Sequence, residues 1–599
     1  TFMLPILLSD EQQHFIDAAL SGKNILVHAC IGSGNTTAIQ HLCETLPADK
    51  TILYLTYNRL LKVDARSKIR SRNTTVNNYH GFAYTILSKL GIKPGVSDLI
   101  QLFLKERPDI PHYDVLIIDE YQDIEQELAE LLEHIKSKNP NIQIVAVGDM
   151  QQKIYDKTTL DVPSFIHSFL GHYEKLTFTN CFRLPASHAA MLGRIWNKPI
   201  KGVNPACQIR HMNTDEIVKF LSEQDPQDIL CLGSRFGYID TLNELEESYP
   251  QKFNKRTVYA SISDDDGNRA APPNNKCAIF TTFDSSKGLE RKICVVFDFT
   301  ESYWRLRIDK PQQSYEIIRN IFCVAASRGK DCIIFADNGE SPLSEKTLSA
   351  KPEKRVHFDN MIISDMFEFK YREDIEQCYK LLDIRCIENV RHEPINIRTM
   401  DGLIDLSPCV GIYQEAVYFK NYDINKSLDL YFLLHPQEKW KYSLRNTSLD
   451  EKILLLTSLK TRQHRYREQV KTPFVRFGEK HAIIKRLKER LKRDETVQVQ
   501  ANIVFKDASG RIAFNALGLA DAVENDTVYE LKFVSELAHS HFLQCACYMV
   551  ALHLPKGILW NTRTNTLYEI RVPNQALFLD AVVKTLTKGE IQKYYTAEK

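Results

Sequence analysis

Two adjacent carboxylates follow a short apolar run near position 119, and this segment constrains the fold more than any other. Residues 113–123 are YDVLIIDEYQD, so Asp119 and Glu120 come directly after VLII. Such a short aliphatic run is typical of a buried strand in a parallel sheet, and ligands bind these sheets at the carboxyl ends of the strands. Three similar runs alternate with helical patterns, at 25–28, 52–55 and 144–147. The first third of the chain is therefore predicted to be α/β with a parallel sheet.

A glycine-containing turn follows the run at 25–28. Residues 29–37 are ACIGSGNTT and lead into a helical stretch, the context in which backbone N–H groups and a helix N-terminus surround a phosphate. The residues predicted to bind a nucleotide here are Gly32, Ser33, Gly34, Asn35, Thr36 and Thr37. Thr36 supplies the hydroxyl for Mg²⁺, but Asn35 stands where a phosphate loop needs lysine. Taken alone, the segment fits an ordinary strand-to-helix turn equally well.

The DEYQD segment favours the nucleotide site over an acidic surface turn. We expect Asp119 to hold Mg²⁺ and Glu120 to orient the attacking water. The sequence at this point resembles the UvrD/Rep-like branch of superfamily 1 helicases, whose motifs occur here in the family's order. They lie at 8–12, 29–37, 55–58, 78–81, 113–123, 147–155, 180–183, 282–290 and 324–330. The resemblance covers about residues 5–340.

The resemblance assigns roles to single residues around the nucleotide. It implies that Gln12 binds adenine, that Phe182 stacks on it, and that Gln152 senses the γ-phosphate. Arg183 and Arg328 are implied to neutralise charge on the γ-phosphate, Arg328 as the arginine finger. Gly288 and Glu290 belong to TFDSSKGLE at 282–290, which contacts nucleotide and DNA in the family, although Asp284 replaces the usual histidine.

The motor implied by this resemblance has two RecA-like parallel-sheet domains, at residues 1–185 and 186–345, and uses ATP and Mg²⁺ on DNA. Asn35 brings no positive charge, so we expect weak or absent ATP turnover with some nucleotide binding retained. Only 39 positions separate His80 from Asp119 and 99 separate Arg183 from Thr282, so the family's accessory insertions are small or missing. We therefore expect translocation on a single strand, or poor unwinding unless a protein partner supplies a wedge or a loading function.

A second group of carboxylates lies near the C-terminus. Asp521 precedes a turn and Glu530-Leu531-Lys532 follows it, so Glu530 and Lys532 share a strand face and Asp521 lies beside them. Two carboxylates and the Leu531 carbonyl form an oxygen site suited to Mg²⁺ or Mn²⁺. Lys532 can orient the water or stabilise charge on phosphorus. The alternative is an ordinary amphipathic hairpin with exposed charges.

More residues favour the catalytic reading of this hairpin. His481 stands at the head of a predicted helix, and Gln544 and Tyr548 are four apart on another. The set resembles the RecB-like branch of PD-(D/E)xK nucleases, which implies that His481 is a further metal ligand and that residues 466–599 form a restriction-endonuclease-like α/β domain. The cysteines after this core that hold an iron–sulfur cluster in some relatives have no counterpart after Cys547, so no cluster is expected. Residues 346–465 are assigned as a linker or accessory region of unknown role.

Composition leaves this reading open. The 14 cysteines are scattered without CxxC spacing, and no long apolar run or basic leader is present, so we expect a cytoplasmic chain without a membrane segment. The sequence thus predicts a helicase or translocase fused to a metal-dependent nuclease that acts on single-stranded or branched DNA, in repair, recombination or defence against foreign DNA. One alternative is a nuclease whose ATPase-impaired motor acts as a nucleotide-sensing DNA clamp. The other is a non-catalytic DNA-binding assembly module.

Overall fold

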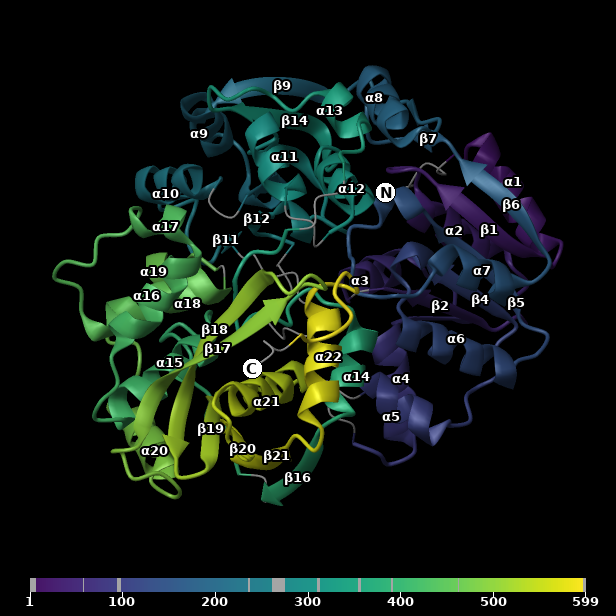
Figure 1. The fold of residues 1–599 in the computed structure, drawn as a ribbon. Coiled ribbons are helices and arrows are strands. Elements are labelled where there is room, and N and C mark those ends of the chain that lie inside the picture. The colour runs from purple at the N-terminus through teal and green to yellow at the C-terminus, as the bar shows by residue number, and fades with distance from the viewer. Residues whose placement is uncertain are drawn as a thin grey trace. The chain divides into compact units, whose positions relative to one another are not determined.

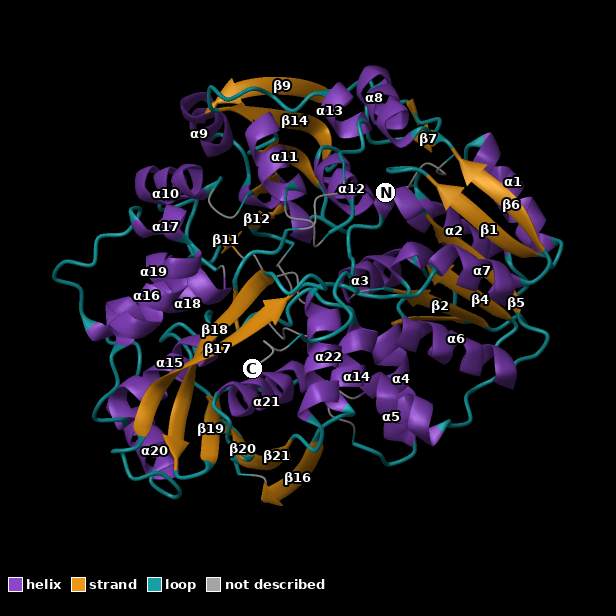
Figure 2. Cartoon of the chain, viewed as in Figure 1, coloured by secondary structure: helices purple, strands orange, loops and turns teal. Residues whose placement is uncertain are grey.

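Two parallel sheets and one mixed sheet organise the chain (Figures 1 and 2). The computed structural model describes residues 7–57, 59–93, 99–234, 237–260, 275–309, 313–353, 357–388, 392–461 and 463–595. Asn58, in the predicted motif at 55–58, lies outside the described residues. Unit 1 comprises Thr1–Tyr259, Asp264–Ile308 and Gln313–Glu353, and unit 2 comprises Ala260–Ser263, Asp309–Gln312 and Lys354–Lys599.

The first sheet of unit 1 has the strand order β3-β2-β4-β5-β1-β6, with parallel pairing throughout. Its strands are β1 (Asn24–Ala29), β2 (Ile52–Thr56), β3 (Thr74–Asn78), β4 (Val115–Asp119), β5 (Gln143–Gly148) and β6 (Tyr173–Phe178). One face packs against α1 (Asp10–Leu20), α2 (Asn35–Thr45) and α3 (Arg59–Lys68). The other packs against α4 (Tyr79–Lys89), α5 (Leu99–Glu106), α6 (Gln126–Lys138) and α7 (Val162–Leu170).

The second sheet of unit 1 has the order β11-β12-β10-β13-β14-β9. Its strands are β9 (Gln208–Asn213), β10 (Ile229–Gly233), β11 (Val258–Ala260), β12 (Ala278–Thr282), β13 (Arg291–Val296) and β14 (Gly329–Asp337). Its helices are α8 (Ala186–Trp196), α9 (Thr214–Ser222), α10 (Ile239–Ser248), α11 (Glu301–Ile308), α12 (Tyr315–Ala325) and α13 (Glu345–Ser349), and β7 (Asn180–Cys181) and β8 (Lys201–Gly202) form a separate short ladder. Much of the chain between Arg183 and Thr282 is thus used to build this sheet and its helices.

Unit 2 contains a mixed sheet of order β15-β18-β19-β20-β21-β16, with β17 paired to β18. Its strands are β15 (Met361–Ile362), β16 (Asp383–Glu388), β17 (Thr496–Lys506), β18 (Ile512–Glu524), β19 (Thr527–Lys532), β20 (Lys556–Asn561) and β21 (Thr566–Arg571). One face packs against α14 (Arg372–Tyr379), α21 (His539–Ala551) and α22 (Gln575–Leu586). The other carries α15 (Ser407–Tyr418), α16 (Ile424–Leu434), α17 (Pro436–Lys439), α18 (Leu449–Thr461), α19 (Arg465–Glu468) and α20 (Phe477–Leu487).

The α/β class with parallel sheets is confirmed for unit 1, and the four predicted strands of its first sheet are β1, β2, β4 and β5. The assignment of 346–465 as a separate linker or accessory region needs correction, because most of this segment belongs to unit 2. It supplies β15 and β16 to the sheet and the helices of one covering layer. Both strands escape sequence reading since β15 has two residues and β16, DIRCIE, carries charges at an edge.

The sequence also led us to expect reduced cysteines and no membrane segment. All 14 cysteines are free thiols, and all but Cys386 are buried. Within the described ranges, no helix is both long and apolar enough to span a bilayer.

Candidate functional site

The turn after β1 has the backbone of a phosphate loop. Gly32 and Gly34 adopt positive φ angles of 65° and 76°, a conformation that favours glycine. Asn35, Thr36 and Thr37 then form the first turn of α2, where free backbone N–H groups point along the helix axis. The Ser33 hydroxyl donates to Asn35 Oδ1 at 2.8 Å, so the asparagine presents an acceptor toward the loop in place of an ammonium group.

Gln12 and Phe182, the two residues predicted to bind adenine, lie beside this loop. The buried Gln12 side chain donates from Nε2 to the Ser33 carbonyl at 3.1 Å, and its Oε1 accepts from the Ser9 amide. A Cβ placed on Gly34 would lie 2.9 Å from Gln12 Nε2 and 3.6 Å from Phe182 Cδ2. The Phe182 ring is 44% exposed, which leaves a face open for stacking. Gly34 therefore keeps the space between the two side chains clear.

The two acidic residues at the carboxyl end of β4 are held in different ways. Asp119 is buried and accepts from the Tyr54 hydroxyl at 2.8 Å through Oδ2, while its Oδ1 has no hydrogen-bond partner among the described residues. Burial and the adjacent Glu120 charge raise the pKa of Asp119 to about 7. Glu120 has a positive φ of 58° directly after the strand, and its Oε2 lies 3.6 Å from Lys287 Nζ.

The residues expected around the γ-phosphate form two groups of polar contacts, one around Gln152 and one around Glu290. Gln152 donates from Nε2 to the Ala29 carbonyl of the loop at 3.2 Å and to Asp149 at 3.1 Å. Arg183 pairs with Glu290 and also donates to the Ser327 carbonyl at 3.2 Å. Although burial opposes ionisation, Arg183, Lys330 and Arg328 lower the pKa of Glu290 to about 2.

Arg328 is buried in the group around Glu290. Burial, and then the neighbouring Arg183, lowers its pKa to about 10. Gly288 adopts φ 73° in the turn before Glu290, and Asp284, which replaces the family's histidine, forms a two-pronged ion pair with Arg307 at 2.8 Å. Lys287 pairs with the buried Asp123, and Lys198, which sequence reasoning missed, pairs with Asp149 at 2.6 Å.

In unit 2 the β18–β19 hairpin brings the predicted acidic pair together. Ala522 is opposite Tyr529, and extending this antiparallel register by one residue places Asp521 opposite Glu530. Asp521 Oδ2 accepts from the Leu531 amide at 2.7 Å. Burial and the Glu530 charge raise the pKa of Asp521 to about 8, and burial also raises the pKa of Glu530.

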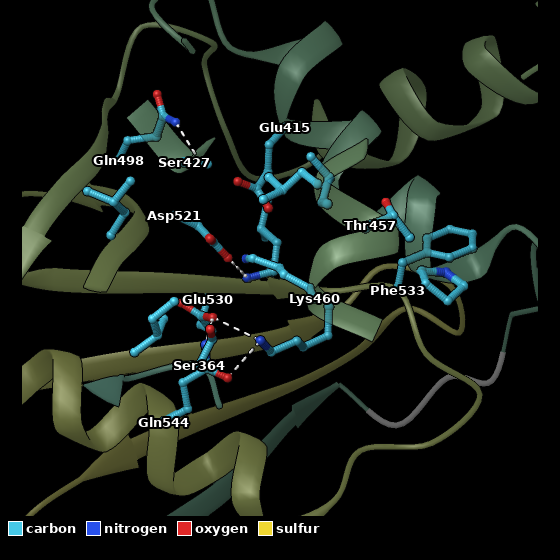
Figure 3. A pocket seen from close by; sticks show the side chains of 18 of the residues that line it. Ser364, Glu415, Ser427, Thr457, Lys460, Gln498, Asp521, Glu530, Phe533 and Gln544 are labelled. Carbon is cyan, nitrogen blue, oxygen red and sulfur yellow. Dashed lines mark hydrogen bonds and ion pairs between the residues drawn. The ribbon is translucent and has the colours of Figure 1, made fainter. Parts of the chain in front are cut away.

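Lys532 and Gln544 complete this cluster, and Figure 3 shows Gln544 beside Glu530. Lys532 Nζ lies 3.0 Å from Glu530 Oε1 and donates to Gln544 Oε1 at 2.8 Å, while Gln544 Nε2 donates to Glu530 Oε1 at 2.8 Å. Tyr548, one turn later on α21, lines the same cavity. A Cβ on Gly518 would lie 2.7 Å from the Tyr548 hydroxyl, so glycine is required for the ring to reach this position.

Sequence reasoning missed one charged residue of this cavity, Glu415; the cavity has a volume of about 240 Å³. Glu415 on α15 and Lys460 on α18 both line it with Asp521, Glu530 and Lys532 (Figure 3). Burial, and then the charges of Asp521 and Glu530, raise the pKa of Glu415 well above its usual value. The only available signal was a lone glutamate in SPCVGIYQEAVY, an otherwise uncharged helix.

His481, predicted as a metal ligand, is not among the residues that line this cavity. It lies exposed on α20, which turns Ile483 and Leu487 toward the core. Residues two apart on a helix differ by about 200° in direction, so His481 points away from the side that Ile483 buries. Glu415, and not His481, is therefore the further candidate metal ligand near Asp521.

The donor atoms at both sites fit a divalent cation. Asp119 Oδ1 and Glu530 Oε2 are buried without hydrogen-bond partners among the described residues, and in unit 2 three carboxylates face two ammonium groups. In the part of the chain that is described, no three His, Cys, Asp or Glu side chains converge closely enough to enclose a metal by themselves. The remaining ligands would therefore be backbone oxygen, water and phosphate, which Mg²⁺ accepts readily.

The family model that matches this chain covers its N-terminal part. Residues 12–158, which include the phosphate loop and DEYQD, match the AAA domain family, and no curated protein matches the chain. The Pif1 helicase of Candida albicans is 14% identical in sequence, covering 58% of this chain and 98% of its own, with a TM-score of 0.31. Arterivirus nonstructural protein 10, a helicase solved with DNA, is 11% identical over 54% of this chain, with a TM-score of 0.29, and this chain spans 63% of its length.

Proposed function

We propose that the protein is an ATP-dependent DNA helicase or translocase of the UvrD/Rep-like branch of superfamily 1, coupled to a Mg²⁺-dependent nuclease of the RecB-like branch. The carrying observation is the cluster in unit 2, where Asp521, Glu530 and Lys532 meet in one cavity. Single-stranded or branched DNA would be the substrate, in repair, recombination or defence against foreign DNA. The 14 free cysteines support a reducing compartment such as the cytoplasm.

Each residue of the cavity has a role in phosphodiester hydrolysis. Asp521, Glu530 and the Leu531 carbonyl would hold Mg²⁺ or Mn²⁺, which neutralises phosphate charge and activates water when bound. Gln544 and Glu530 fix the Lys532 ammonium, which can donate to a non-bridging oxygen as negative charge develops there. Glu415 is placed to bind a cation-bound water or to accept its proton. Burial and mutual repulsion raise the pKa values of these carboxyl groups, and a bound cation would stabilise their charged forms near neutral pH.

The motor residues divide the work of phosphoryl transfer. Glycines 32 and 34 let the loop backbone approach phosphate, while Gln12 and Phe182 border the base position. Glu120 would orient water, Asp119 with Thr36 would hold Mg²⁺, and Gln152 links the loop to Asp149. Arg183 and Arg328, whose charges both act on Glu290, would supply positive charge to the γ-phosphate. A protein partner would supply the wedge, because little chain is left for accessory insertions.

Cleavage of labelled single-stranded DNA with Mg²⁺ or Mn²⁺, with and without ATP, tests the nuclease. Asp521→Asn and Lys532→Met should each abolish cleavage while the protein keeps its circular dichroism spectrum. Asp526→Asn is the matched control, since it makes the same change on the exposed turn of the same hairpin, and it should cleave normally. Cleavage that survives both Asp521→Asn and Lys532→Met would refute the nuclease assignment.

Asn35 favours a second candidate, a nuclease whose motor half binds nucleotide without turning it over. In that case ATP and a non-hydrolysable analogue should change cleavage or DNA affinity equally. A coupled motor instead requires hydrolysis, so the analogue should fail to support processive cleavage. A chain that neither cleaves DNA nor hydrolyses ATP would be the third candidate, a DNA-binding assembly module.

A further inference from the structure

Trp440 is the one tryptophan that stands outside the core. It is 78% exposed in unit 2, directly after α17. The other three tryptophans are each at most 4% exposed: Trp196, Trp304 and Trp560. An aromatic side chain has a large apolar surface that folding normally buries, so an indole left in water is a candidate for contact with a ligand.

The segment that carries Trp440 is basic between two acidic positions, Glu438 before it and Asp450 after it. Residues 439–449 are KWKYSLRNTSL, with three cations and no carboxylate. Lys439, Lys441 and Arg445 are all exposed, and Lys441 Nζ lies 5.7 Å from the centre of the Trp440 ring. The segment therefore combines an exposed aromatic face with positive charge on both sides of it.

This segment is anchored to the wall of the cavity that contains Asp521. Tyr431, which lines the cavity, donates from its hydroxyl to Glu438 at 3.0 Å, two residues before Trp440. Tyr442 packs against the core of unit 2, and the Arg467 guanidinium lies 4.8 Å from its ring centre. Trp440 thus follows a helix that is held in place, and Figure 1 shows α17 beside α16, whose residues Ser427, Leu430 and Tyr431 line that cavity.

We infer that Trp440, Lys439, Lys441 and Arg445 form a docking platform for single-stranded DNA that delivers substrate to the cavity; this inference rests on the proposed nuclease function. An unpaired base can stack on an indole whatever its identity, while the cations bind the phosphates around it. Bases of a duplex are already stacked and cannot reach the ring. An acidic peptide would satisfy the cations but leave the indole in water.

Tryptophan fluorescence of the full chain reports on DNA binding at this platform, because Trp440 is the only exposed tryptophan among the four. With EDTA present to prevent cleavage, a 15-nucleotide oligothymidylate should quench the emission, and a blunt 15-base-pair duplex should quench it much less. Trp440→Phe should remove the quenching but keep most of the affinity, measured by anisotropy of a labelled oligonucleotide. Trp440→Ala should weaken binding roughly 5- to 100-fold.

Charge and matched controls sharpen the test. Replacing Lys439, Lys441 and Arg445 by glutamine should reduce the slope of log affinity against log salt by about 2, since each phosphate contact on a single strand contributes about 0.7. Phe477→Ala, which removes an exposed aromatic from α20, should leave affinity unchanged. Equal weakening by Phe477→Ala, or tighter binding of polyglutamate than of oligothymidylate, would overturn the platform.

Cleavage assays separate this inference from the proposed function. Trp440→Ala should raise KM for single-stranded DNA with little change in kcat, because the indole does not touch the reacting atoms. If oligothymidylate quenches Trp440 but Asp521→Asn does not affect cleavage, the nuclease assignment fails and the platform stands. If cleavage depends on Asp521 but no quenching occurs, the platform fails alone.

Discussion

Asn35→Lys is the change that most directly tests the motor site. The lysine would replace an uncharged amide at the first residue of α2, where helix N–H groups already favour phosphate. The cations close to the loop do not compensate for its absence, because Arg183 is paired with Glu290 and Lys198 with Asp149. We therefore expect the substitution to raise ATP turnover.

The size of this effect follows from the contacts of Asn35. A charge-assisted contact to phosphate contributes about 1.5–3 kcal/mol, and loss of the Ser33–Asn35 hydrogen bond offsets it by about 0.5–1.5 kcal/mol. The net gain of about 1–1.5 kcal/mol corresponds to roughly tenfold tighter ATP binding. Donors that act mainly in the transition state contribute more, so kcat should rise on the order of 100-fold.

The assay is steady-state ATP hydrolysis with saturating single-stranded DNA, analysed for kcat and KM separately. Asn35→Gln is the matched control, since it lengthens the side chain without adding charge, and it should hydrolyse ATP no faster than the unchanged chain. If Asn35→Lys is folded, binds ATP and is still no faster, the missing lysine is not what limits the motor.

Three further changes have outcomes set by single contacts in unit 2. Glu415→Gln should raise the melting temperature, because it removes one of three mutually repelling carboxylates. The same substitution should lower Mg²⁺-dependent cleavage at least tenfold. If the melting temperature and the cleavage rate changed in the same direction, Glu415 would have no role at the site. Gly518→Ala should destabilise the protein by about 1–3 kcal/mol in urea unfolding, because its Cβ would lie 2.7 Å from the Tyr548 hydroxyl. Burial and Lys588 lower the pKa of Lys370 to about 8, so its charged form opposes folding below that pH and stability recovers as pH rises toward about 10.5. The Lys370→Met variant should therefore have a free energy of unfolding about 2–4 kcal/mol higher than the unchanged protein at pH 7. This difference should narrow above pH 8, which urea titrations of both proteins below and above pH 8 would show.

The parts of the fold that were predictable share a local signal. β2, β4 and β5 each contain a run of four buried apolar residues and β1 contains a run of three, so the sequence alone indicates these strands. β9, QIRHMN, is an edge strand with alternating exposure, and it carries no such signal. α6 was predictable because Leu128, Leu131, Leu132 and Ile135 recur at helical spacing and are all buried.

The site of unit 2 was predictable where its residues are close in sequence. Asp521, Glu530 and Lys532 lie on one hairpin, so strand geometry alone brings them together. Glu415 comes from more than one hundred residues upstream, and only tertiary packing of α15 against the sheet places it there. His481 was assigned from its position at a helix start, but the register of α20 is decided by Ile483 and Leu487, whose burial is worth more than any contact of an exposed histidine.

The two acidic sites share a physical signature that the fold alone does not require. Asp119 Oδ1 and Glu530 Oε2 are buried acceptors without partners among the described residues, and each such atom costs about 1–3 kcal/mol. The pKa values of Asp119 and Asp521 are raised to about 7 and 8, chiefly by burial and then by a neighbouring carboxylate. A chain selected for stability alone would replace these groups with apolar ones, whereas bound cations would relieve both penalties at once. Mg²⁺ should therefore raise the melting temperature of the unchanged protein, and less so in Asp521→Asn, whether or not either site turns over substrate.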